Sequence, residues 1–369
     1  MTRSQHPIPG AVHPLDRDGL RGRVNDALAA FMDRQSAVLA DVGEGMAPVA
    51  EALRDFLVDG GKRLRPGFCY WGWRGAGGVD AGPAGDAAVR AATSLELLQA
   101  SALIHDDLMD SSDTRRGKPA VHRRFEALHR ASGWCSNAAG FGEAAAVLLG
   151  DLCLSWSDEM FSGSGVDPAA LAAAKPLFDV MRTEVMAGQY LDVLEQAMGG
   201  GSVERSRRVI RFKSAKYTIE RPLHVGAALA GAGPELLVAY SAYGLPLGEA
   251  FQLRDDVLGV FGDPAETGKP AGDDLREGKR TVLLALAAER GTAAQRRIVD
   301  ELLGDPALDD AGVKDLQGVI AGTGALAEVE AMIGTLTERA LAALDSAAVT
   351  ADARTVLHEL AEAATVRRV

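Results

Sequence analysis

The sequence is poor in cysteine and in aromatic residues. Its 369 residues include 3 cysteines, Cys69, Cys135 and Cys153, without a CxxC pair, which excludes a disulfide framework and argues against a zinc site. Aromatic residues make up 5% of the chain and hydrophobic residues 47%. A core rich in Ala, Leu and Val and poor in aromatics favours helices. We expect reduced thiols and a cytoplasmic location.

The sequence also lacks long apolar runs and an excess of positive charge. No uncharged apolar run approaches the ~18 residues of a spanning helix, so no membrane span is expected. The first residues contain Pro7 and Pro9 but no apolar stretch typical of a secretory signal. Acids outnumber bases 51 to 39, giving a formal net charge of −12. Because nucleic-acid binders normally present a basic surface, we expect no nucleic-acid partner.

Helical spacing dominates the chain from about residue 20. Apolar residues recur three and four positions apart, as in Val24, Leu28 and Phe31, and strand-like alternation is nearly absent. Helices are expected over 143–161, 169–198, 206–230, 235–261, 280–290, 294–303, 312–320 and 324–346, with a loop over 131–141. No glycine-rich break is long enough for an interdomain linker. We therefore predict an all-α protein, with a flexible arm over 1–16 and a single domain over 17–369.

Two clusters of acidic residues each follow an apolar helical stretch. Asp106 and Asp110 are four residues apart, so a helix would place both carboxylates on one face. Like charges at this spacing weaken a helix unless a cation such as Mg²⁺ bridges them. A solvated helix end is the alternative for the first pair alone. A related pattern returns at Asp255 and Asp256.

Basic clusters accompany both acidic clusters. Arg115 and Arg116 follow the first, and guanidinium groups suit phosphate. Further bases lie in the stretches 60–66, 213–216 and 269–280. The Gly60-Gly61 stretch lacks the spacing of a P-loop. Acids for a metal and bases for phosphate, repeated twice, indicate a metal–polyphosphate site.

The combination of motifs resembles the trans-isoprenyl diphosphate synthases, also called polyprenyl synthetases, and is most similar to bacterial geranylgeranyl-type enzymes. The matching motifs are GGKRLRP at 60–66, LIHDDLMDSSDTRRGKP at 103–119, FQLRDDVLGVFGD at 251–263 and TGKPAGDDLREGKR at 267–280. The resemblance implies mostly antiparallel helices around a deep central cavity, the isoprenoid synthase fold, with the two aspartate-rich helices facing each other. It also implies a homodimer.

The resemblance assigns roles to individual residues. Asp106, Asp110 and Asp255 would bind about three Mg²⁺ ions. Asp107 and Asp256 would assist through water molecules or through hydrogen bonds to the residues that bind the metal. The allylic diphosphate would be held by Arg115, Lys213, Ser214, Gln252, Lys269 and Lys279. Isopentenyl diphosphate would be held by Lys62, Arg65, Gln99 and Arg116. The residues expected to act in catalysis are Asp106, Asp110, Asp255, Arg115, Lys213 and Lys269.

The sequence departs from the common family pattern at four places. Gly259 stands where many members have the last aspartate of the second motif, and Gln99 where many have histidine. Ser214 replaces a threonine and keeps the hydroxyl. The stretch 123–140 is longer than in compact members and is expected to form a loop near the cavity mouth.

The implied reaction condenses isopentenyl diphosphate with an allylic diphosphate (dimethylallyl, geranyl or farnesyl) and releases pyrophosphate. In this family, residues just before the first aspartates set product length; Ser101 and Ala102 are small, so we predict growth past farnesyl to geranylgeranyl, C20. The alternatives are a longer-chain synthase and a non-catalytic or regulatory subunit of a heteromeric synthase. A terpene cyclase would lack GGKRLRP and the second Asp-Asp, and a metal or phosphate store would not need the paired basic clusters.

Overall fold

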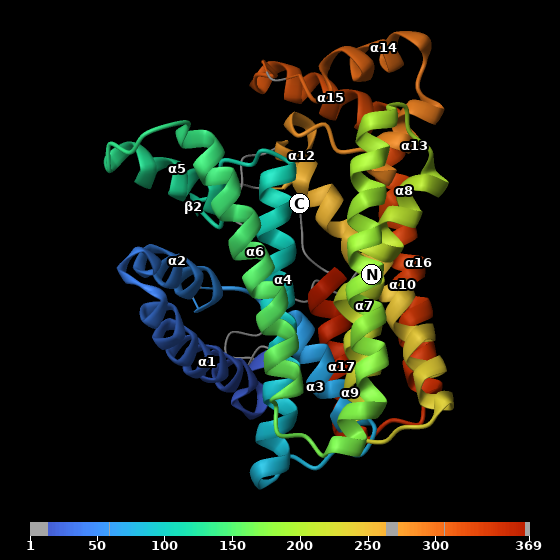
Figure 1. The fold of residues 1–369 in the computed structure, drawn as a ribbon. Coiled ribbons are helices and arrows are strands. Elements are labelled where there is room, and N and C mark those ends of the chain that lie inside the picture. Colours follow the sequence, from blue (N-terminus) through green and yellow to red (C-terminus); the bar gives the residue numbers. More distant parts are fainter. Residues whose placement is uncertain (1–13, 59, 263–271, 306, 366–369) are drawn as a thin grey trace.

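The computed structural model describes residues 14–58, 60–262, 272–305 and 307–365. Most of them are helical, as Figure 1 shows. The first half contains the helices η1 (Pro14–Gly19), α1 (Leu20–Val42), η2 (Glu44–Met46), α2 (Ala47–Val58), α3 (Leu64–Gly75), α4 (Gly82–Met109), α5 (Val121–Ala131), α6 (Ala138–Ser162) and α7 (Pro168–Met198). The second half contains α8 (Val203–Val209), η3 (Ile210–Glu220), α9 (Arg221–Leu229), α10 (Pro234–Phe261), α12 (Asp273–Arg276), α13 (Val282–Arg290), α14 (Ala293–Leu302), α15 (Asp310–Gly322), α16 (Ala325–Ser346) and α17 (Ala351–Thr365). The all-α prediction is confirmed.

One short hairpin interrupts the helices. Strands β1 (Thr114–Arg115) and β2 (Lys118–Pro119) pair antiparallel, with Arg115 opposite Lys118. Arg116 and Gly117 form its turn, both with positive φ, at 54° and 74°. The glycine accepts this conformation without strain. The hairpin turns the chain after α4 back over the cavity, which carries Arg115 and Arg116 toward the acids of α4.

The hydrophobic interior forms two clusters that share the helices η3, α10 and α16. The first joins α1–α4, α6, α7 and α9, and the second joins α13–α16 to the C-terminal half of α10. Helix α10 contributes Tyr243 and Leu247 to the first cluster and Leu253 and Val257 to the second. In Figure 1, α4 and α6 lie on one side of the molecule and α7, α10 and α16 on the other. This arrangement holds the two aspartate-rich helices apart.

The N-terminal arm ends earlier than expected. Residues 1–13 of the predicted arm lie outside the described residues. Pro14–Gly19 forms a 3-10 helix, and Leu15 is 1% exposed and packs against Gly67 of α3. The chain therefore joins the fold from residue 14, because the leucine gains a place in the core.

The predicted loop over 123–140 is wrong for most of its length. Val121–Ala131 forms α5, which packs against α6, and only residues 132–137 connect the two helices. Val121, Phe125 and His129, spaced four apart, are buried along one side of α5. This amphipathic spacing stabilises a helix where a loop was expected. The loop expected over 131–141 is correspondingly shorter, since α6 begins at Ala138.

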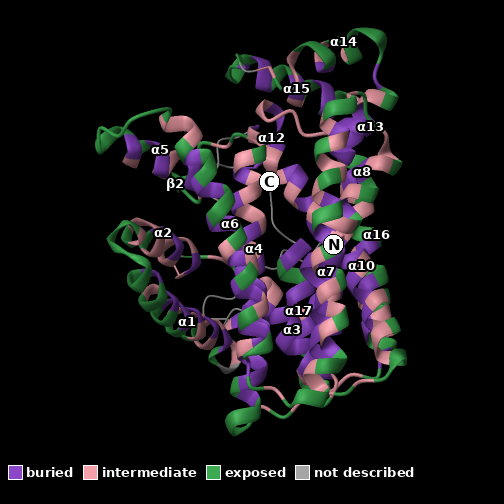
Figure 2. Ribbon diagram, viewed as in Figure 1, coloured by how far each residue is buried: buried purple, intermediate pink, exposed green. Residues whose placement is uncertain are grey.

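Helix α6 has the length and mean hydropathy that a membrane span would need, although it carries charged residues such as Glu143 and Asp151. It packs against α4 and α5, but Val147 and Leu148 are 44% and 62% exposed. On α7, Met186, Tyr190 and Val193 are exposed at spacings of four and three, so they share one face. Figure 2 shows exposed residues recurring along both helices. We call these five residues the α6–α7 apolar face.

Candidate active site

A cavity of about 1940 Å³ lies between the aspartate-rich helices. Its walls come from α4, α7, η3 and α10, and the loops before α3 and after α12 close its ends. The volume exceeds the ~300–1,000 Å³ typical of small-molecule sites, which suits two substrates and a growing chain. The cavity gathers the expected residues Lys62, Arg65, Gln99, Ser101, Ala102, Asp106, Arg115, Arg116, Lys213, Ser214, Gln252, Asp255, Asp256 and Lys279.

The first acidic cluster ends α4. Asp106 lines the cavity, and Asp110 caps the helix by donating its N–H to the Asp106 carbonyl at 2.8 Å. Asp107 points the other way, is fully buried, and accepts a hydrogen bond from Arg115 Nε at 2.8 Å. Asp107 thus holds Arg115 beside the cavity.

The pKa values of Asp106 and Asp110 are shifted in opposite directions because their surroundings differ. Burial raises the pKa of Asp106, but the charges of Lys213, Lys279 and Arg115 outweigh burial and hold that pKa below its usual value. Burial and the neighbouring charge of Asp106 raise the pKa of Asp110 to about 6. Asp106 is therefore ready to accept a cation at neutral pH, whereas Asp110 takes up a proton first as the pH falls toward 6.

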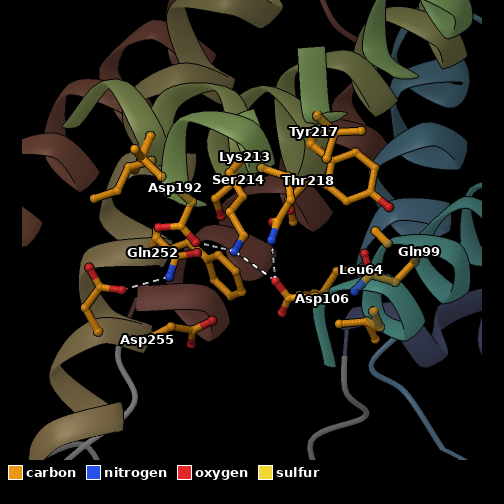
Figure 3. Close-up of a pocket in the computed structure, with 18 of the residues that line it drawn as sticks. Leu64, Gln99, Asp106, Asp192, Lys213, Ser214, Tyr217, Thr218, Gln252 and Asp255 are labelled. Atoms are coloured by element: carbon orange, nitrogen blue, oxygen red, sulfur yellow. Dashed lines mark hydrogen bonds and ion pairs between the residues drawn. The ribbon is translucent and has the colours of Figure 1, made fainter. Parts of the chain in front are cut away.

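The second acidic cluster lies on α10. Asp255 and Asp256 both line the cavity, and Gln252 donates a hydrogen bond from Nε2 to Asp256 Oδ1 at 2.8 Å. Burial first, and then the charges of Asp274 and Asp255, raise the pKa of Asp256 to about 8. Figure 3 shows Asp255 and Asp106 on different sides of the pocket, with Lys213 reaching between the walls. The two aspartate-rich helices therefore face the same space.

The helix that carries Lys213 is a π-helix, η3, a rare form that is frequent at functional sites. Its wider turn directs Lys213, Ser214, Tyr217 and Thr218 into the cavity. Lys213 Nζ lies 3.0 Å from Asp106 Oδ1 and 2.6 Å from Asp192 Oδ2. Burial lowers the pKa of Lys213, but the two carboxylates outweigh burial and raise it. Lys213 is therefore a fixed positive charge at the centre of the site.

A second basic group gathers where α3 begins. Lys62, Arg65, Gln99 and Arg116 all line this end of the cavity. Arg65 Nη2 donates to Thr218 Oγ1 at 2.8 Å, and its guanidinium lies over the Tyr217 ring at 4.3 Å. Gln99 Oε1 is buried with no hydrogen-bond partner among the described residues. The positive charges of Lys62, Arg65 and Arg116 at one end of the cavity suit an anionic ligand.

Arg63 of the same motif has a structural task. It is 4% exposed, binds Glu96 at 2.6 Å, and donates to the carbonyl of Leu57 at 2.7 Å. Its φ of 53° is left-handed. This anchoring places its neighbours Lys62 and Arg65 toward the cavity.

Lys279 connects the two acidic clusters. Its Nζ lies 2.6 Å from Glu277, 3.4 Å from Asp274 and 4.0 Å from Asp110. Burial lowers the pKa of Lys279, but these acids outweigh it and raise the pKa well above its usual value. The expected partner of Lys279 in the motif, Lys269, lies outside the described residues.

Sequence reasoning missed several residues of this site. Gln189 donates to Asp106 Oδ1 at 2.9 Å, and Asp192 binds Lys213. Both come from α7, three residues apart on one face. No local signal marked them, because α7 also carries other polar residues, such as Lys175, Asp179 and Arg182. Tyr217 and Thr218, which follow the recognised Lys213-Ser214 pair, carried no motif of their own.

The carboxylates fit a metal that is shared with a ligand. In the described part of the chain, no three His, Cys, Asp or Glu side chains converge closely enough to enclose a cation. The acids stand instead as oxygen donors on two walls, Asp106 on α4 and Asp255 on α10. Mg²⁺ prefers such hard donors, and commonly takes one or two carboxylates and completes its shell with water and substrate phosphates. The donor set therefore fits Mg²⁺ held between the protein and a diphosphate.

The residues expected to control product length lie on the cavity wall. Ser101 is 3% exposed, and both it and Ala102 line the cavity one turn before Asp106. Leu98 and Val185 continue the wall with larger side chains, whereas Leu95 is buried in the core. The apolar part of the cavity is thus open past residues 101 and 102.

Comparison with known proteins places this architecture in a family. Residues 47–320 match the family model described as polyprenyl synthetase. The chain is 34% identical over 284 residues to geranylfarnesyl diphosphate synthase of Aeropyrum pernix, covering 76% of this chain and 82% of that protein. It is 32% identical to (2E,6E)-farnesyl diphosphate synthase of Mycobacterium tuberculosis, covering 84% and 79%.

Solved structures agree with the sequence comparison. The crystal structure of geranylgeranyl pyrophosphate synthase from Corynebacterium glutamicum, complexed with isoprenyl diphosphate and magnesium, has a TM-score of 0.91 and 44% identity, covering 95% of this chain and 99% of that one. The family is metal-dependent, and its fold is the isoprenoid synthase fold. The chain therefore belongs to the polyprenyl synthetase family, and it is a trans-prenyltransferase of the prenyl diphosphate synthase type.

Proposed function

We propose that this enzyme is a Mg²⁺-dependent synthase that adds isopentenyl diphosphate to allylic diphosphates and makes geranylgeranyl diphosphate as its main product. One observation carries the proposal: a single cavity joins two aspartate-bearing walls to two separate basic groups. Two basic groups suit two diphosphates. The acids between them suit a metal ion that is bound by both the protein and one of the diphosphates. The names of its relatives include farnesyl, geranylgeranyl and geranylfarnesyl synthases, so product length is the specific part of the proposal.

The central residues would bind the allylic diphosphate. Lys213, Arg115 and Lys279 place positive charge around Asp106, where the leaving pyrophosphate would lie. Bound Mg²⁺ would supply Lewis acidity that neutralises the charge developing on this leaving group. These fixed charges stabilise the departing pyrophosphate more than the intact ester, so they lower the barrier to ionisation. Asp106 and Asp255 would hold the metal.

The other basic group would bind isopentenyl diphosphate. Lys62, Arg65 and Arg116 would take its phosphates, and Gln99 would donate from its amide. The double bond of this substrate then attacks the allylic cation, and the new cation loses a proton to the departing pyrophosphate. Leu98 and Val185 face the hydrocarbon with no nucleophilic atom, which protects the cation from capture.

We propose that the enzyme acts as a homodimer through the α6–α7 apolar face. Groups of exposed apolar side chains often mark an interaction surface, and α6 and α7 each present such a group. The exposed Met186 and Tyr190 also line the cavity, so a second copy docked there would shield the cavity from solvent.

Incubation with Mg²⁺, isopentenyl diphosphate and each allylic primer tests the proposal. The products would be dephosphorylated and weighed by mass spectrometry, with C20 expected as the main alcohol. Asp106→Ala should abolish turnover and leave helicity unchanged, whereas Asp310→Asn, at an exposed side chain on α15, should behave as wild type. If folded wild-type protein elongates no primer, the synthase activity is refuted; if another chain length dominates, only the C20 product is.

A further inference from the structure

Helix α10 carries one acid fewer than its counterpart. Asp106 and Asp110 on α4 are four residues apart, and the matching positions on α10 are Asp255 and Gly259. Residues at this spacing share one helix face. Asp255 and Gly259 both line the cavity, so the glycine leaves a gap in the acidic face.

The backbone does not require glycine at position 259. Gly259 lies within α10 and is absent from the glycines with positive φ among the described residues. The restriction comes from space. A Cβ added at Gly259 would overlap Asp274 Oδ2 and lie 2.5 Å from Asp274 Cγ and 3.1 Å from Oδ1. The carboxylate of Asp274 therefore fills the volume that a side chain at 259 would occupy.

Asp274 is held in this position from its own side. It belongs to α12, is 9% exposed, and lines the cavity together with Asp255 and Asp256. Lys279 Nζ lies 3.4 Å from its Oδ1, and the Lys279 N–H donates to its carbonyl at 3.0 Å. Because Lys279 also approaches Asp110 at 4.0 Å, the Asp274 carboxylate joins the same charged network as the first cluster.

We propose that Asp274 supplies the missing third carboxylate of the second acidic cluster, reaching from α12 over Gly259 to the metal side of the cavity. This inference rests on the proposed function of the cavity and assigns metal binding to Asp274 of the 267–280 stretch, to which the sequence analysis gave no metal role. It makes the residue types at 259 and 274 mutually dependent. A side chain at position 259 and the carboxylate of Asp274 would occupy the same volume. Metal binding needs one carboxylate in that volume, from either position.

Metal binding measured without turnover tests the proposal. Mn²⁺ would be titrated into the protein in the presence of inorganic pyrophosphate and followed by electron paramagnetic resonance. Asp274→Asn keeps the shape of the side chain and removes its charge, so it should weaken Mn²⁺ binding about tenfold or more. Gly259→Ala should weaken binding as well, because its methyl group displaces the carboxylate.

The double variant Gly259→Asp/Asp274→Ala moves the acid onto α10 and should restore Mn²⁺ affinity relative to Asp274→Ala alone. If Asp274 served only to position Lys279, the double variant would stay as weak as Asp274→Ala, and the proposal would be wrong. Unchanged Mn²⁺ affinity in Asp274→Asn would also overturn it. Asp310→Asn is the matched control, since its carboxylate pairs with Arg276 on the surface. Circular dichroism verifies folding, and primer elongation by the wild-type protein tests the proposed function separately.

Discussion

Lys213 Nζ on the π-helix lies 3.0 Å from Asp106 Oδ1 on α4. This contact joins a group expected to hold the leaving diphosphate to a group expected to hold the metal. The positive charge of Lys213 helps to keep Asp106 ionised despite its burial. The two residues depend on each other. Lys213 keeps Asp106 ionised and able to bind a cation, and Asp106 holds the Lys213 side chain in the cavity.

Lys213→Ala should lower turnover by about 100-fold, because it removes one preorganised donor to the departing pyrophosphate. It should also weaken metal binding, since Asp106 loses the neighbouring charge that lowers its pKa. Steady-state incorporation of labelled isopentenyl diphosphate measures the effect. Lys175→Ala is the matched control, because Lys175 on α7 likewise bridges two acids, Asp158 and Asp179, without lining the cavity. Equal activity of the two variants would show that Lys213 has no role in catalysis.

Metal-free protein should lose stability as the pH rises. Burial and the charges of Asp274 and Asp255 raise the pKa of Asp256 in the folded state from 3.8 to about 8. The folded state keeps the proton while the unfolded state loses it, so the contribution of Asp256 to stability is present below about pH 4 and is lost as pH rises to about 8. Within that window the free energy of unfolding should fall by up to about 1.4 kcal/mol per pH unit from this group.

Thermal unfolding in a chelator, compared between wild type and Asp256→Asn, measures this loss. The variant cannot ionise at this position, so its advantage over wild type should grow between about pH 4 and about pH 8. Parallel melting profiles for the two proteins would show that Asp256 ionises normally in the fold.

Ser101→Phe should shorten the product. Ser101 is 3% exposed and lines the cavity, so a phenyl ring there would fill the path past Ala102 toward Leu98. Chain growth should stop near C15, as seen by mass spectrometry of the dephosphorylated products. Ser346→Phe, at the exposed end of α16, should leave product length unchanged. An unchanged product in Ser101→Phe would mean that another part of the wall limits growth.

The sequence predicted the helices and most of the site because both have local signals. Periodic apolar residues located the long helices, and the acids and bases of the site lie in compact motifs such as 60–66 and 103–119. The spacing of Asp106 and Asp110 defined a helix face without any tertiary information. Even α5 had such a signal in Val121, Phe125 and His129, which the expected insertion obscured.

Contacts between segments that are distant in the sequence left no local pattern from which they could be predicted. Gln189 and Asp192 reach Asp106 and Lys213 only because α7 packs beside η3. The π-helical winding of Ile210–Glu220 is likewise set by packing, since its residues do not distinguish it from an α-helix. Asp274 was read as part of a basic motif, and its place beside Gly259 depends on how the chain returns after α10.

Leu148→Glu should separate the proposed dimer into monomers. Leu148 on α6 is 62% exposed, and a carboxylate in the centre of an apolar interface would lose its hydration without gaining a partner. Sedimentation velocity measures the change in mass, and circular dichroism shows whether the subunit stays folded. Val238→Glu is the matched control, because Val238 on α10 is 69% exposed but lies outside the α6–α7 apolar face. If wild type is a dimer and Leu148→Glu keeps the same mass, the second copy docks elsewhere. If the variant is monomeric, we also expect lower turnover, because Met186 and Tyr190 would leave the cavity open to water.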